Sequence, residues 1–186
     1  MRSERARSAE RHAPYASILG DAFETLHPNV RRSHEAPLTA EGVFDVVHGT
    51  HRAVPFLVKL MKLPAAGTGV PVTLNVAVDE PLAVRVDRRI GATRLVTRQR
   101  AHGGFLIEEN GPGRLAFSLR ADGGCLLYEH AQLRFLSFRL PAALSPRVRA
   151  RVSSDPHGWR VEVTVEWRGH LVCRYGGTMR ALQATS

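Results

Sequence analysis

The chain has little cysteine and no long apolar run, and each shortage excludes a class of protein. Its two cysteines, Cys125 and Cys173, lie in apolar, strand-like segments. We expect two buried free thiols in a reducing compartment rather than a disulfide framework. No apolar run approaches the roughly 20 residues of a membrane-spanning helix. Residues 1–13 are charged and lack the apolar stretch of a signal peptide. The sequence therefore predicts a cytoplasmic protein.

Lysine is also scarce. Lys59 and Lys62 are the only lysines among 26 basic residues, which leaves 24 arginines against 17 acidic residues. A net charge of +9 could attract nucleic acid through its phosphates. The arginines are scattered along the chain instead of gathering in one segment, so we do not expect nucleic acid as a partner.

Motifs of familiar catalytic chemistry are missing. No Gly-Lys-Ser/Thr follows the glycine pairs, and no serine stands in a Gly-x-Ser-x-Gly elbow. The closest pair among nine histidines is His48 and His51, with no carboxylate or thiol at metal-ligand spacing. Surface or turn positions are expected for these two and for His27 and His34. The sequence predicts no metal site and no cofactor, and it favours a non-enzymatic role over a catalytic one.

Short segments of alternating apolar and polar residues, separated by glycine-rich turns, are abundant from Val72 to Tyr175. This pattern is typical of antiparallel strands joined by tight turns. The predicted strands are Val72–Val78, Leu82–Arg89, Arg94–Ala101, Phe105–Glu109, Arg114–Arg120, Cys125–Phe138, Arg147–Ser153, Trp159–Trp167 and Leu171–Gly176. About nine such strands would curl into a barrel or half-barrel, because closure removes exposed edges. The fold class is α+β, mostly β.

Two amphipathic helices are predicted before this meander. The first runs from Tyr15 to Leu26 and the second from Ala53 to Lys62, each with one apolar stripe at helical spacing. Between them we expect a polar connection over residues 29–40 and a strand over Gly42–Gly49. The two helices together are expected to form a lid on the sheet.

The domain organisation follows from these elements. We expect a disordered tail over residues 1–13, a single domain over residues 14–180 and a short tail over residues 181–186. A chain of 186 residues is long enough for one such domain to bury a sizeable core.

A curved sheet of this kind can enclose a small apolar ligand, and three polar residues are predicted to contact it. Arg89, Glu109 and Tyr175 each lie near an apolar strand face. Glu108 and Glu109 are adjacent in a strand and point to opposite faces, so they cannot act as an acid–base pair. Glu109 shares its face with Phe105. The basic strand over residues 147–151 is expected to present its arginines to solvent.

An ordered series of short motifs resembles the bacterial domain-of-unknown-function family 4166 over about residues 14–180. The motifs are Tyr15-x-x-x-Leu19-Gly20-x-x-Phe23-x-x-Leu26-His27-Pro28, Arg31-Arg32-x-His34, Val47-His48-Gly49, Leu63-Pro64-x-x-Gly67, Gly111-Pro112-Gly113, Leu140-Pro141-x-x-Leu144-x-Pro146 and Gly169-x-Leu171-Val172-x-Arg174-Tyr175-Gly176-Gly177. The chain departs from the family pattern at Asp87, before Arg88, and at Glu166-Trp167. If those positions line a site, this chain has an altered one.

The resemblance implies a cytoplasmic bacterial domain that occurs alone or joined to a saccharopine-dehydrogenase-like Rossmann domain. It carries no catalytic residues over to this chain. Two roles remain open from the sequence. The first is a binding module for a small apolar ligand. The alternative is an accessory or interaction domain that works with a Rossmann-type oxidoreductase.

Overall fold

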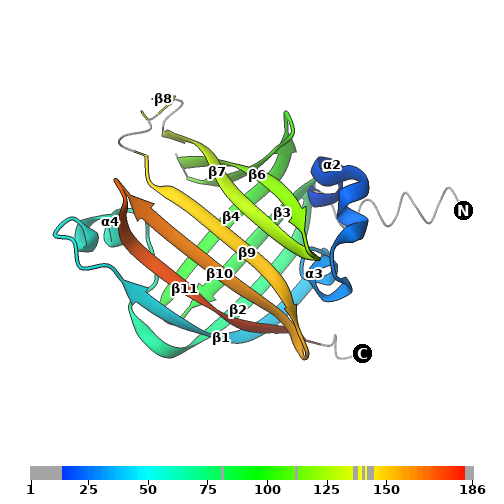
Figure 1. The fold of residues 1–186 in the computed structure, drawn as a ribbon, viewed down its shortest axis with the longest axis horizontal. Coiled ribbons are helices and arrows are strands. Elements are labelled where there is room, and N and C mark those ends of the chain that lie inside the picture. Colours follow the sequence, from blue (N-terminus) through cyan, green and yellow to red (C-terminus); the bar gives the residue numbers. More distant parts are fainter. Residues whose placement is uncertain are drawn as a thin grey trace, which may run out of the picture.

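A single antiparallel sheet that closes on itself makes up most of the protein (Figure 1). The computed structural model describes residues 14–80, 82–111, 113–135, 138–139, 141 and 145–182. The strand order is β6-β5-β4-β3-β2-β1-β11-β10-β9-β7-β8, and an additional pairing joins β6 to β7. That pairing closes ten of the 11 strands into a barrel and leaves the two-residue β8 outside it.

The strands follow one another along the chain with short turns between most of them. Their bounds are β1 (Leu38–His48), β2 (Gly67–Glu80), β3 (Ala83–Ile90), β4 (Thr93–His102), β5 (Phe105–Asn110), β6 (Gly113–Asp122), β7 (Cys125–Phe135), β8 (Phe138–Arg139), β9 (Arg147–Asp155), β10 (Gly158–Trp167) and β11 (His170–Ala181). The paired glycines Gly103-Gly104 and Gly123-Gly124 have positive φ angles between 56° and 79°, the left-handed region that tight hairpin turns need.

The helices lie at opposite ends of the barrel (Figure 1). The helix α2 (Tyr15–Leu19), the 3-10 helix η1 (Gly20–Thr25) and α3 (Pro28–Arg32) cover one end, where α2 contacts β4, β5 and β6. The helix α4 (Val54–Leu60) lies at the other end and contacts β11. None of the described helices has the length and apolar character to cross a membrane.

The predicted barrel is confirmed, and the differences are local. The single helix expected over Tyr15–Leu26 tightens into a 3-10 helix at Gly20, whose φ is 55°. The prediction of a polar connection over residues 29–40 was wrong, because this segment contains most of α3 and the start of β1. The expectation of one lid made by both helices was also wrong, since one helical region lies at each end. The tail predicted over residues 1–13 lies outside the described residues.

The pairing register fixes which side chains point into the barrel, because partners in an antiparallel ladder share a face. Phe44 faces Gly177, Val86 faces Thr97, and both pairs lie on the inner side. The inner face carries Ala40, Phe44, Val46, Val72, Leu74, Val84, Val86, Ile90, Leu106, Leu115, Phe117, Leu119, Leu126, Val152, Trp159, Val163, Val165, Cys173 and Met179. The core is therefore the barrel interior, joined at its ends by apolar residues of the helices.

Gly177 allows β1 and β11 to approach closely. A Cβ atom there would lie 2.0 Å from the carbonyl oxygen of Val43, so the strands would have to separate. We expect Gly177→Ala to lower the free energy of unfolding by about 1–3 kcal/mol or more, measured by urea denaturation. Gly113→Ala is the control, since its new Cβ would meet its nearest atom at an ordinary 3.5 Å. Equal effects of the two substitutions would contradict this account.

Candidate functional site

A group of polar side chains interrupts the apolar inner wall of the barrel. Arg88 on β3 and Glu108 on β5 form an ion pair in which Arg88 Nη2 lies 2.6 Å from Glu108 Oε1. The same nitrogen donates to Thr97 Oγ1 at 3.1 Å. The register places all three side chains on the face that also carries Val86 and Leu106. A charged pair thus lies inside the barrel.

The guanidinium of Arg88 is only partly satisfied. Its Nε is buried and has no hydrogen-bond partner among the described residues. Burial is the largest single influence and works against the charged form. The attraction of Glu108 and the smaller contributions of the three tyrosines together outweigh it, so the pKa of Arg88 lies above its ordinary value. Arg88 therefore keeps its charge inside the barrel, and its Nε–H remains available to donate a hydrogen bond.

Gln99 and Tyr15 extend the network from Glu108 towards the helical end. Gln99 Nε2 donates to Glu108 Oε2 at 3.2 Å, and the hydroxyl of Tyr15 donates to Gln99 Oε1 at 2.5 Å. Tyr15 is the first residue of α2. Its ring is buried, so the hydrogen bond lies inside the apolar core. The position of α2 over the end of the barrel is therefore coupled to the ion pair.

His34 and Tyr128 form a second polar contact at the same end. The His34 Nδ1 lies 2.8 Å from the carbonyl oxygen of Val30, and its Nε2 lies 2.6 Å from the hydroxyl of Tyr128. Since a carbonyl only accepts, the imidazole donates from Nδ1, and in the neutral ring Nε2 then accepts the Tyr128 proton. His34 lies in the turn after α3, one of the two positions expected for it, but its side chain is buried rather than on the surface. Tyr15 contacts both rings and links the two networks.

All three tyrosines of the chain belong to this region. Burial raises the pKa of Tyr15 to about 12, and a hydrogen bond with Tyr128 opposes part of that rise. Burial also raises the pKa of Tyr175 to about 12, against the attraction of Arg88. The pKa of Tyr128 lies well above its usual value, again chiefly because of burial. Each phenol therefore stays protonated at neutral pH and can donate a hydrogen bond.

Several inward-facing side chains are not fully buried, although they point into the barrel. The side chain of Arg88 keeps 25% of its accessible surface and that of Glu108 keeps 12%. The half-buried residues of the inner face include Leu74, Leu95, Leu115, Leu119, Tyr128, His130, Val148, Ala150, Val161 and Tyr175. A barrel of about eight strands is just filled by its own side chains, and this one has ten. The interior is thus wide enough for water-sized molecules to reach its polar wall.

The three residues predicted from the sequence do not lie together. Tyr175 points into the barrel, where its ring stacks on Phe44 at a centroid distance of 6.2 Å. Arg89 is exposed on the outer side of β3. Glu109 is also on the outer side, where it pairs with Arg100 at 3.3 Å and Arg114 at 3.1 Å.

The neighbours Arg88 and Glu108 occupy the interior, and the sequence held a signal for both. Arg88 alternates with the apolar residues Val84, Val86 and Ile90, so it shares their inner face. Glu108 is two residues from Leu106 and so shares its inner face. The first residues of β5 are apolar on both faces, however, so the sequence does not show which of its two glutamates points inwards.

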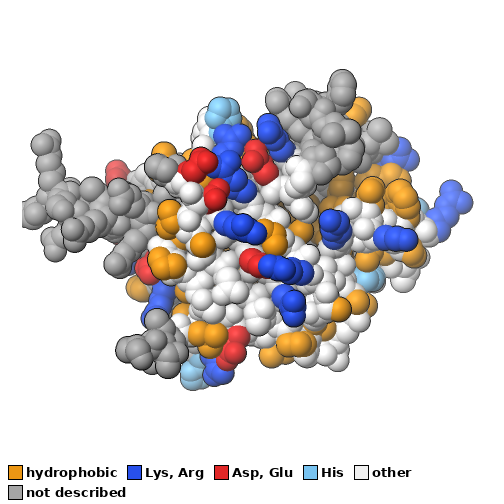
Figure 2. All heavy atoms as spheres, turned by 180° about the vertical axis from the view of Figure 1, so that it is seen from behind, with side chains coloured by type: hydrophobic (Ala, Val, Ile, Leu, Met, Phe, Trp, Pro, Cys, Tyr) orange, Lys and Arg blue, Asp and Glu red, His pale blue; other side chains and the backbone are white. Residues whose placement is uncertain are grey.

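The outer side of the same strands carries a different kind of surface. Basic and acidic side chains lie interspersed there (Figure 2). The ion pairs include Arg94 with Asp87 at 2.6 Å and Arg98 with Asp79 at 2.5 Å. The arginines predicted to face solvent on β9, at positions 147, 149 and 151, are exposed. Paired, exposed charges of this kind stabilise little and mark a solvated surface.

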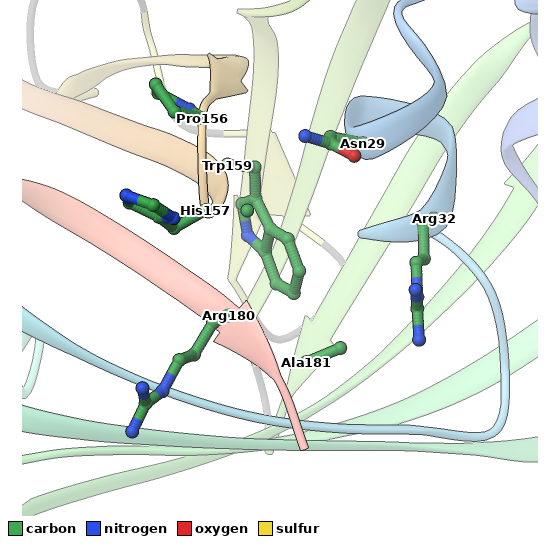
Figure 3. A pocket seen from close by; sticks show the side chains of 8 residues that line it. Asn29, Arg32, Pro156, His157, Trp159, Arg180 and Ala181 are labelled. Atoms are coloured by element: carbon green, nitrogen blue, oxygen red, sulfur yellow. The ribbon is translucent and has the colours of Figure 1, made fainter. Parts of the chain in front are cut away.

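A cavity of about 330 Å³ lies beside Trp159, between α3 and the ends of β10 and β11 (Figure 3). Two of its polar side chains are already engaged: Asn29 donates to the carbonyl of Asp155 at 3.0 Å, and Arg180 pairs with Glu41 at 2.6 Å. Among the described residues no three metal-ligating side chains gather anywhere. Both cysteines are free and buried, as the sequence predicted. The barrel interior is the stronger candidate site.

The fold and the site define a closed antiparallel β-barrel with a polar group on its inner wall and helices at both ends. The chain belongs to the family described as domain of unknown function DUF4166, whose sequence profile matches residues 26–179. The resemblance seen in the sequence is thereby confirmed.

A comparison of folds finds a similar crystal structure, a protein of unknown function from the DUF3598 family of Nostoc punctiforme. The TM-score is 0.52 at 11% identity, over 84% of this chain and 49% of that protein. The chain thus spans about half the length of that protein, and the likeness concerns the fold alone. No curated protein gives a significant match.

Proposed function

We propose that this domain binds a small, largely apolar molecule inside its barrel. A hydrogen-bond-accepting group of that molecule would contact Arg88. One observation carries the proposal: Arg88 points into the barrel, remains 25% accessible, and has an Nε donor without a partner among the described residues. A buried donor without an acceptor is costly, and a ligand oxygen would remove that cost.

The chemistry of the inner wall indicates the kind of ligand. Ligand sites are mostly apolar, with a few polar groups that orient the molecule. Leucine, valine and phenylalanine side chains supply the apolar wall here. Because Glu108 balances the charge of Arg88, a neutral carbonyl suits the site as well as a carboxylate. Tyr175 also points into the barrel, and burial raises the pKa of its phenol to about 12, so its protonated hydroxyl offers a second donor.

The test is a fluorescence titration with 1-anilinonaphthalene-8-sulfonate, an apolar probe with an anionic acceptor. We expect saturable binding to the wild type and at least about tenfold weaker binding to Arg88→Met, since one hydrogen bond to a charged donor is worth about 1.5–3 kcal/mol. Arg89→Met is the matched control, because it removes the neighbouring arginine from the outer face. Absent binding, or equal loss in both variants, would contradict the proposal.

The alternative from the sequence, an accessory domain that works with a Rossmann-type oxidoreductase, stays a prediction. The titration separates the two roles, because an accessory domain need not bind the probe through Arg88. The cytoplasmic location and the bacterial source implied by the family resemblance also stay predictions.

A further inference from the structure

The outer face of α4 combines exposed apolar side chains with basic ones. Phe56 is 67% exposed and Leu60 is 63% exposed. They lie one helical turn apart, so they share a face. Val54 and Leu57 on the opposite face are buried against the barrel. The helix is therefore held by one apolar face and presents a second apolar face to solvent.

Three cations lie close to this pair in the sequence. Arg52, Lys59 and Lys62 are exposed, and the two lysines are the only ones in the chain. None of the three forms an ion pair among the described residues, in contrast to the paired arginines on the outer side of β3 and β4. No acidic residue occurs between Asp45 and Asp79, so the segment that carries α4 supplies no local partner for these three cations. Figure 2 shows hydrophobic and basic side chains together at the edge where α4 lies.

The position of α4 is fixed relative to the barrel. The ring of His51, just before the helix, stacks on His170 of β11 at a centroid distance of 4.5 Å. The backbone N–H of Gly49 donates to the carbonyl of Val172 at 3.1 Å. A rigid helix with two protruding apolar side chains needs no ordering before it inserts them into a partner.

We propose that this end of the barrel docks on the surface of an anionic lipid bilayer. Phe56 and Leu60 would enter the boundary between headgroups and acyl chains, and Arg52, Lys59 and Lys62 would face the headgroups. Interfacial helices combine an apolar face with flanking lysines or arginines in this way, and each such cation is attracted by anionic lipid. Two side chains are too few for the roughly 1,200–2,000 Å² of a stable protein interface. This proposal does not depend on ligand binding in the interior.

The experiment is sedimentation of the full chain with vesicles of two compositions. One is phosphatidylcholine alone and the other is an equal mixture of phosphatidylcholine and phosphatidylglycerol. We expect binding to the mixed vesicles, about tenfold weaker binding to phosphatidylcholine alone, and release at about 1 M salt, where the Debye length is about 3 Å. The double variant Phe56→Ser/Leu60→Ser and the variant Lys59→Gln/Lys62→Gln should each lose about tenfold in the partition coefficient.

The matched control is Val78→Ser/Leu82→Ser. These side chains are also exposed, at 58% and 51%, but lie at the β2–β3 turn, at the opposite end of the barrel. This variant should bind as the wild type does. Equal binding to both vesicles, or equal loss in the Val78/Leu82 and Phe56/Leu60 variants, would overturn the proposal. Absent vesicle binding together with a dimer that Phe56→Ser/Leu60→Ser dissociates, seen by light scattering, would overturn it in favour of a second copy of this chain.

Discussion

Arg88→Met lowers the free energy of unfolding by about 3 kcal/mol, because it leaves the carboxylate of Glu108 without its cation inside the barrel. Removal of one partner from a buried ion pair costs about 3–5 kcal/mol, and we expect the lower end because the Arg88 side chain is 25% accessible. Glu108→Gln should have a similar effect, since it leaves the guanidinium unbalanced. Urea denaturation measures both changes.

The outward-facing neighbours provide the controls. Arg89→Met and Glu109→Gln alter the same residue types one position along the chain, but on the outer side of the barrel. Exposed charges contribute about 0–1 kcal/mol, so both should stay close to the wild type. If the inner and outer substitutions cost the same, the ion pair does not lie in the interior as described.

Alkaline pH is expected to unfold the protein, and none of its tyrosines should titrate near pH 10 while it stays folded. Folding favours the protonated phenol when the folded pKa exceeds the unfolded one. The contribution of each protonated phenol to the free energy of unfolding is complete below about pH 10 and is lost as the pH rises towards 12. A rise in pKa from 10.0 to about 12 for Tyr15 and for Tyr175 corresponds to about 3 kcal/mol for each phenol, at about 1.4 kcal/mol per pKa unit.

Ultraviolet absorbance of the phenolate follows this titration directly. The folded protein should give a single steep step above pH 11, coincident with loss of the circular dichroism signal. The chain in urea should titrate near pH 10. Tyr175→Phe removes one buried phenol and should shift the alkaline transition upwards. Reversible ionisation of one or more tyrosines near pH 10 in the folded protein would show that those phenols are exposed, against this account.

The barrel could be predicted from the sequence because its signals are local. Positive-φ glycines such as Gly104 and Gly124 mark the turns, and alternation marks each strand between them. The closing contact between β6 and β7 was expected only in general terms, from the need to remove free edges. The start of β1 at Leu38 was missed, since Thr39 and Glu41 lie on its outer side and make the segment polar.

The site was harder to predict, because it depends on which face of each strand points inwards. Period-2 alternation separates two faces without naming the inner one. The first residues of β5 are apolar on both faces, so Glu109 rather than Glu108 was predicted to contact the ligand. Tyr15 and His34 come from helices far away in sequence, and their contacts with Gln99 and Tyr128 arise only when the helical end closes over the barrel. No local pattern carries that information.

The central claim is that the barrel interior holds a small molecule at Arg88. Native mass spectrometry of the full chain, purified from its own host without denaturation, tests it most directly. The account predicts a non-covalent small-molecule adduct on the wild type and on Arg89→Met, and its absence from Arg88→Met. A bare wild-type mass, or the same adduct on Arg88→Met at the same occupancy, would contradict it.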